Sequence, residues 1–141
     1  MPGRWNWGPV AVAARRKAPA DRDNRQRAER LGRWAEYACL LMLWLQGYRI
    51  LARRLRLPVG EIDIIAAKGK VLAVVEVKAR PSLEAALASL PKASWRRRHA
   101  AIHHFIARRP HLAGHGIRFD LMAVLPRRLP RHIPDVWQAG R

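Results

Sequence analysis

The fold is decided by two short stretches of the chain, Gly60-Glu61-Ile62-Asp63-Ile64-Ile65-Ala66 and Val75-Glu76-Val77-Lys78-Ala79-Arg80. Both stretches are rich in β-branched residues, which favour strands. Gly69 lies between them, where a hairpin would need its turn. The sequence therefore predicts two adjacent antiparallel strands, over residues 61–66 and 71–79, joined by a turn over residues 67–70.

The register of this hairpin determines which side chains meet. A turn centred immediately after Gly69 would place Asp63 opposite Glu76. The same register would place Glu61 opposite Lys78. Opposite residues of an antiparallel pair share one face of the sheet, with Cβ atoms about 5 Å apart. A slip of one residue would break this arrangement, so the prediction depends on the position of the turn.

Two carboxylates on one face repel each other and raise each other's pKa unless a cation lies between them. A divalent cation such as Mg²⁺ resolves the conflict, because it prefers hard oxygen ligands and is commonly bound by one or two carboxylates. Lys78 would then contact a phosphate or orient an attacking water. The alternative is a ladder of ion pairs on a solvated face. The apolar neighbours Ile65, Leu72 and Val74 weigh against that alternative, because they indicate a buried face.

Composition limits the class of protein. The chain has 141 residues, enough for one domain, and carries a formal net charge of +18, which favours a polyanionic partner, nucleic acid first. Cys39 is the only cysteine, so an intrachain disulfide and a cysteine-rich zinc site are excluded. We expect it to be a small buried residue. The longest apolar run, residues 38–45, is too short to span a membrane, and the N-terminus lacks the order of a signal peptide. We therefore expect a cytoplasmic protein without a membrane partner.

Outside the hairpin, hydrophobic periodicity and turn residues predict the remaining elements. They are a helix over residues 24–46, a strand over 48–54, a loop over 55–60, a short helix or ordered loop over 82–90, a helix over 92–108 and a strand over 117–124. The order α-β-β-β-α-β indicates an α/β fold with a mixed central sheet flanked by helices. Residues 23–141 form one domain, preceded by a flexible basic arm over residues 1–22, for which a start-site artefact without a role is the alternative.

The two long helices each have a predicted inward face. The first uses Leu31, Ala35, Ala38, Met42 and Leu45, widened by Trp34 and Leu41, and the second uses Trp95, Ile102, Phe105 and Ile106. Glu36 lies at the edge of the first apolar stripe. It could reach the sheet and bind metal through water, or pair with Arg33 at the helix surface. The residues alone favour the surface pair.

The hairpin stretches and four further segments together resemble the YraN family of predicted endonucleases. That family is similar to Holliday-junction resolvases within the PD-(D/E)xK, restriction-endonuclease-like superfamily. The further segments are residues 32–41, 47–51, 118–120 and 132–137, so that the resemblance covers roughly residues 24–137. A lone E-x-K triplet with an upstream aspartate is common by chance, whereas the two hairpin blocks at this spacing are specific.

The resemblance implies a restriction-endonuclease-like α-β-β-β-α-β core and a metal-dependent endonuclease acting on DNA, with branched or junction DNA as a candidate substrate. It implies that Asp63 and Glu76 are ligands of Mg²⁺ (or Mn²⁺) and that Lys78 is the catalytic lysine. Glu36 would be an accessory acidic residue near the metal, and Glu61 a further member of the motif. A homodimer is compatible with the resemblance.

Basic side chains are expected to bind nucleic acid. Between Ala85 and Phe119 the chain has no acidic residue, which favours salt-sensitive binding of phosphates by the second long helix over a merely solvated face. The expected contacts on this helix are Lys92, Arg96, Arg97 and Arg98. The resemblance adds Arg80 as a phosphate contact. Arg54, a position where many relatives have Asn, is a further expected contact. His99 and His103 have the spacing of a zinc pair but lack an obvious third ligand. The alternative function is a nucleic-acid-binding protein of the same fold with little or no cleavage alone. A protein that uses its charge at a membrane surface is the weakest alternative.

Overall fold

A computed structural model of the chain describes residues 19–138. Its elements are α1 (Pro19–Leu45), β1 (Arg49–Leu57), β2 (Gly60–Lys68), β3 (Val71–Ala79), α2 (Leu83–Ala88), α3 (Lys92–Ala107), the 3₁₀-helix η1 (Pro110–Leu112), β4 (Gly116–Val124) and β5 (Arg131–Trp137). The strands form one sheet in the order β1-β2-β3-β4-β5, in which β3 and β4 run parallel and the other neighbours antiparallel. The predicted α/β fold with a mixed sheet is therefore confirmed.

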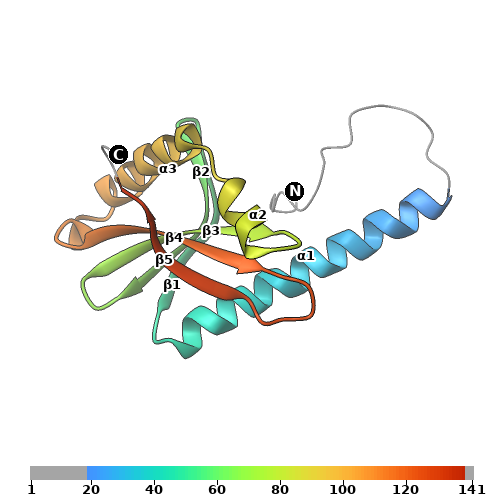
Figure 1. Cartoon of the computed structure of the whole chain (residues 1–141). Helices are drawn as coiled ribbons and strands as arrows, with labels where there is room; N and C mark the ends of the chain where they lie inside the picture. Colours follow the sequence, from blue (N-terminus) through green and yellow to red (C-terminus); the bar gives the residue numbers. More distant parts are fainter. Residues whose placement is uncertain (1–18, 139–141) are drawn as a thin grey trace.

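The sheet lies between the two long helices, with α1 on one face and α3 on the other (Figure 1). Successive side chains of a strand point to opposite faces, and β3 follows this rule. Val75 packs with Leu43 of α1, whereas Val74 packs with Ile102 of α3. No helix within residues 19–138 is long and apolar enough to cross a lipid bilayer.

The hairpin has the predicted register. Its paired residues run from Ile64↔Val75 to Lys68↔Val71, and Gly69 supplies a positive φ of 57° in the turn. Glycine adopts this conformation at little steric cost, which explains the turn position. β3 also has the predicted bounds. The position of the turn residue was therefore a correct guide to the register of the hairpin.

The structure differs from the sequence prediction in three places. β1 continues to Leu57, so residues 55–57 are strand rather than loop. β5 occupies a tail for which no strand was predicted, and Pro134 is tolerated there because β5 is an edge strand. The segment 82–90 contains a short helix, capped by Ser82, which is one of the two predicted alternatives. α1 begins at Pro19, so residues 19–22 of the predicted arm are helical, and residues 1–18 lie outside the described residues.

The predicted inward face of α1 is wrong in part, whereas that of α3 is confirmed. Ala35 is buried and Met42 packs against the core, as predicted, but Trp34, Leu41 and Leu45 are exposed. The other side chains that face the sheet are those of Glu36, Cys39 and Leu43, and the side chain of Leu31 lies outside the described residues. Residues 34–45 are apolar almost all round the helix, so periodicity could not distinguish the two faces. In α3, Trp95, Ile102 and Phe105 are buried and Ile106 is half-buried, as predicted.

Gly60 allows β2 and α3 to approach each other closely. A Cβ atom at this position would lie 2.5 Å from the carbonyl oxygen of Arg97, a backbone atom that cannot move without shifting the helix. Glycine is required here by space and not by φ, since only Gly47 and Gly69 have positive φ among the described glycines. The contact fixes the position of α3 next to the beginning of β2.

We expect Gly60→Ala to reduce the free energy of unfolding by about 2–3 kcal/mol, because the methyl group forces α3 away from β2. Gly114→Ala is the matched control, since a Cβ atom there meets nothing within 4 Å. It should be neutral or stabilise by up to about 1 kcal/mol through the unfolded chain. Urea unfolding of both variants checks this expectation, and equal stabilities would contradict it.

Candidate functional site

Two charged side chains are buried on the α3 face of β3. Glu76 is 5% exposed and Lys78 is 8% exposed, in a strand whose other buried residues are all apolar. Alternation along the strand places both on the same face as Leu72 and Val74. The sequence prediction of a buried rather than solvated face is therefore confirmed, and these charges need partners within the protein.

Glu76 is held by two cations. Arg98 of α3 donates to Oε2 of Glu76 from both Nη2 (2.9 Å) and Nε (3.1 Å). The ammonium of Lys78 lies 3.3 Å from Oε1. Each oxygen of the carboxylate thus has its own cation, one from the neighbouring helix and one from the same strand. Arg98 was expected to contact nucleic acid, and the structure instead places it on Glu76.

Asp63 approaches the same position from β2. Its Oδ2 accepts a hydrogen bond of 2.9 Å from the amide of Val77, where the ladder between β2 and β3 has ended at Ile64↔Val75. Although part of the residue reaches solvent, its carboxyl group is surrounded by protein. Burial, and next the charge and hydrogen bond of Glu76, raise the pKa of Asp63, and the Val77 amide and Arg98 only partly offset them. The predicted neighbourhood of the two carboxyl groups is thus present.

The residue of β1 that lies opposite Asp63 has an unusual backbone conformation. In register, Arg54 falls between the pairs Arg53↔Ile64 and Leu55↔Ile62, which is the position opposite Asp63. Arg54 has a φ of 52°, in the left-handed region that non-glycine residues rarely adopt. Asp63 therefore lies one residue beyond the last β2–β3 pair and opposite a distorted position of β1. This leaves its carboxyl group available to the side chains and amide of β3.

Glu36 does not pair at the helix surface, and that prediction is wrong. It is 2% exposed, forms an ion pair with Arg54, and lies 3.8 Å from Nη1 of Arg53. Arg54 is thus engaged by α1, whereas nucleic-acid contact was predicted for it. Burial, followed by the charges of Asp63 and Glu36, raises the pKa of Cys39, so this thiol stays protonated as the small buried residue that was expected.

The carboxyl groups of Asp63 and Glu76 fit a divalent cation by their chemistry. They are hard oxygen donors, and the proximity of Glu76 raises the pKa of Asp63, which is the effect expected of two neighbouring carboxyl groups that a cation would relieve. Glu36 is not grouped with them: within residues 19–138 there is no cluster of three or more His, Cys, Asp or Glu side chains that could hold a metal ion. Only the two adjacent carboxyl groups are therefore brought together by the structure.

The remaining predicted residues lie around this cluster. Glu61 is exposed and pairs across the sheet with Arg56, since the β2–β3 ladder ends before it would reach Lys78. Glu61, Arg97 and Arg98 line a pocket of about 420 Å³ between the β1–β2 turn and α3. Lys92, Arg96 and Arg97 are exposed on α3, as binding residues would need to be. Arg80 is half-buried and donates to the carbonyl of Ala79.

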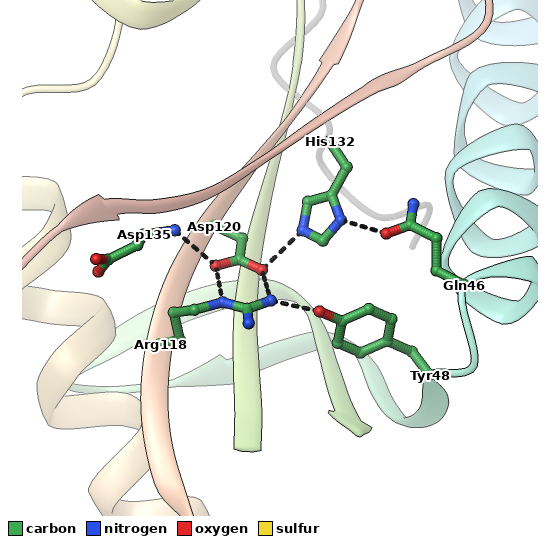
Figure 2. Close-up of polar contacts among 6 residues, drawn as sticks. All are labelled: Gln46, Tyr48, Arg118, Asp120, His132 and Asp135. Carbon is green, nitrogen blue, oxygen red and sulfur yellow. Dashed lines mark hydrogen bonds and ion pairs between the residues drawn. The ribbon is translucent and has the colours of Figure 1, made fainter. Parts of the chain in front are cut away.

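Sequence reasoning missed a second polar network, on the opposite face of the sheet (Figure 2). Its centre is Asp120 of β4, which is fully buried and is paired in register with Val75, so it faces α1. Arg118 donates to both carboxylate oxygens, at 2.8 and 2.7 Å, and His132 lies 2.7 Å from Oδ2. The amide of Asp135 donates to Oδ1 at 3.0 Å.

The network continues to the end of α1 and the beginning of β1. His132 contacts Gln46 at 2.9 Å, and Arg118 also donates to the hydroxyl of Tyr48. Burial alone would raise the pKa of Asp120, but the hydrogen bonds of Arg118, His132 and the Asp135 amide outweigh it and hold the pKa below its ordinary value. The signal in the sequence was a single acidic residue inside an apolar strand, with His132 in the next segment.

The chain is thus a mixed α/β domain. One face of its sheet carries the neighbouring carboxyl groups of Asp63 and Glu76 with their cationic and amide partners, and the other face carries the buried network around Asp120. Its sequence matches the family described as "Uncharacterised protein family UPF0102" over residues 35–124, and the chain belongs to this family. This agrees with the resemblance to the YraN family seen in the motifs.

Relatives of similar length support the membership. A UPF0102 protein of Parvibaculum lavamentivorans is 48% identical over 111 residues, covering 79% of this chain and 84% of the relative. Another, of Chelativorans sp., is 46% identical over 82% of this chain and 94% of the relative. A third, of Paramagnetospirillum magneticum, is 46% identical over 86% of this chain and 96% of the relative.

We expect Asp120→Asn to lower the free energy of unfolding at pH 7 by about 2–3 kcal/mol, because it removes one charge of a buried ion pair. Since the folded pKa lies below that of an unfolded aspartate, the contribution is fully present above about pH 4 and is lost as the pH falls through the folded pKa. The difference between the two proteins should therefore shrink in acid. Urea unfolding at a series of pH values measures it.

The control for this variant is Asp135→Asn. The side chain of Asp135 is exposed and contacts Gln138, while only its backbone amide serves Asp120. Asparagine also tolerates the positive φ of this position. The control should stay within about 0.5 kcal/mol of the parent protein. A loss in Asp135→Asn as large as that in Asp120→Asn would count against the network as the cause.

Proposed function

We propose that this protein is a metal-dependent endonuclease that hydrolyses phosphodiester bonds in DNA, with branched or junction DNA as a candidate substrate. The observation that carries the proposal is the position of Asp63 and Glu76, two adjacent carboxyl groups on neighbouring strands, with Lys78 beside them. The net charge of +18 supports a nucleic acid as the partner.

In this proposal Asp63 and Glu76 hold Mg²⁺ or Mn²⁺, and Glu36 acts from α1 through its ion pair with Arg54, the residue opposite Asp63. The metal would supply an activated water and would stabilise negative charge on the phosphoryl group. Lys78 lies two residues after Glu76 on the same face of β3. Its ammonium would orient the attacking water or contact the phosphate under attack. Glu61, at the mouth of the neighbouring pocket, would face the substrate rather than the cation.

Arg98 is a built-in counter-ion in the proposed site. Its guanidinium neutralises Glu76 and also lowers the raised pKa of Asp63. A divalent cation on the same carboxylate would compete with Arg98, because both need the oxygen lone pairs of Glu76. The released guanidinium would then be available to a phosphate, which reconciles its observed contact with the nucleic-acid role expected from sequence.

Exposed cations on α3 would bind the DNA backbone. Lys92, Arg96 and Arg97 belong to the helix that covers the face on which Glu76 lies, so phosphates held by them would run close to the carboxyl groups. Arg80, which follows β3, would extend this surface past Lys78. Such contacts give affinity that depends on salt but carry little sequence information.

A second candidate is a nucleic-acid-binding protein that cleaves little or nothing alone. The neutralisation of the carboxylates within the chain favours it, since Glu76 has Arg98 and Lys78, and Glu36 has Arg54. In that case the cluster would stabilise the fold, and the basic surface of α3 would be the functional part.

The proposal predicts metal-dependent cleavage that needs Lys78. Linear, flapped and four-way DNA should be cut with Mg²⁺ or Mn²⁺ and not with EDTA, and Lys78→Met should reduce the rate by about 10²–10⁴-fold. Lys70→Met is the control, because Lys70 is exposed in the turn at the other end of β3. Equal cleavage by Lys78→Met and the parent protein would mean a contaminating nuclease.

Binding to DNA should also depend on α3. The double variant Arg96→Ala/Arg97→Ala should reduce the slope of log affinity against log salt by about two, close to one per lost phosphate contact. The control Lys68→Ala/Lys70→Ala removes the same charge from the exposed turn between β2 and β3, at the opposite end of β3 from Lys78. Equal slopes in the two variants would contradict a binding surface on α3. Tight binding without cleavage under any metal would favour the second candidate.

A further inference from the structure

The face of α1 that points away from the sheet is unusually apolar. Trp34, Tyr37, Leu41, Trp44 and Leu45 are 59, 65, 54, 66 and 65% exposed. Among the residues whose side chains the structure describes, seven large hydrophobic residues are exposed, and five of them lie on this one helix. Single exposed hydrophobic residues are ordinary, whereas a contiguous patch of large ones marks an interaction surface.

The five side chains form one continuous stripe. With 3.6 residues per turn, their spacing confines them to an arc of about 100° and a length of about 17 Å. The opposite side of the same turns packs on the sheet through Ala35, Cys39 and Leu43. α1 is therefore apolar all round in this segment, which is the pattern of a helix covered on every side.

We propose that this stripe is the interface with a second copy of the chain, with the two α1 helices packed against each other across a two-fold axis. Spacings of three and four residues between apolar side chains are those of a helix–helix seam. A two-fold interface needs a self-complementary patch, and an uncharged apolar stripe satisfies this condition.

The area is sufficient for a stable dimer. Aromatic side chains bury about 150–250 Å² each, so five large side chains that are each about 60% exposed offer roughly 600 Å² per copy. A symmetric pair that covers them fully would remove about 1,200 Å² from water, which is the lower end of the standard range of roughly 1,200–2,000 Å² for specific interfaces.

The charge distribution favours a second copy over a polyanion. Two chains of net charge +18 repel each other, so a contact between them is favoured where cations are few. Arg80, Arg127 and Arg128 lie beside the stripe only at its Trp34 end, where they line a pocket with that residue. From Trp34 to Leu45 the sequence has no Lys or Arg, and its one charged residue, Glu36, is buried against β1. Nucleic acid or an anionic membrane would need cations between the aromatic residues. The pairing also leaves α3, on the other face of the sheet, outside the interface.

The test is the mass of the full chain in solution, measured by sedimentation velocity in moderate salt that screens the repulsion. The parent protein should be a dimer of 16.1 kDa chains, and Leu41→Glu and Trp44→Glu should each weaken it by at least about 30-fold in Kd, the size of an interface hot spot. Leu87→Glu is the control, because Leu87 is 43% exposed but lies on α2. It should remain dimeric.

A second measurement does not rely on a disruptive change. Leu41→Cys should be cross-linked between chains by a short bismaleimide, and Leu87→Cys should not, while the buried Cys39 serves as the internal reference. A monomeric parent protein, whether or not it binds anionic vesicles, would overturn the proposal. So would a dimer that Leu41→Glu and Trp44→Glu leave intact. The result is independent of nuclease activity, because none of these residues contacts the carboxyl cluster.

Discussion

A carboxylate buried on the central strand must be neutralised, and the arrangement of the domain around β3 follows from that requirement. Glu76 has Lys78 on its own strand, and its second oxygen needs a cation from a different element. Arg98 supplies it only if α3 lies close against the sheet, and this approach depends on the absence of a side chain at Gly60. The neutralisation of Glu76, the position of α3 and the glycine at position 60 therefore depend on one another. A buried ion pair of this kind specifies geometry more than it adds stability.

The two buried acidic sites differ in how completely they are satisfied. Asp120 receives donors on both oxygens, and its pKa is lowered, so it remains a stable anion. Asp63 has one amide donor and a neighbouring carboxylate, and its pKa is raised. A well-satisfied carboxylate holds elements together, whereas a poorly satisfied one retains affinity for a proton or a cation. The contrast supports a structural role for one face of the sheet and a chemical role for the other.

Local signals in the sequence were sufficient for the hairpin and insufficient for its surroundings. Gly69 fixed the turn, and the turn fixed the register that brings Asp63 to Glu76. The partner of Glu76 could not be inferred, because Arg98 is one of several consecutive arginines and only tertiary packing selects it. The partner of Glu36 was missed because Arg54 owes its direction to a positive φ that no residue type signals. β5 was missed because a proline lies within it.

The Asp120 network has a consequence for the order in which the chain folds. Gln46 and His132 are 86 residues apart in sequence, and Tyr48 and Arg118 are 70 apart. Such contacts carry a large loop-closure cost and are favourable only after the intervening hairpin and helices have formed. The network ties the last strand to the end of the first helix, and we expect these long-range contacts to form late in folding. Loss of β5 would remove the contact of His132 with Gln46 and so loosen the end of α1. The domain should therefore fold as one cooperative unit rather than from its N-terminus onward.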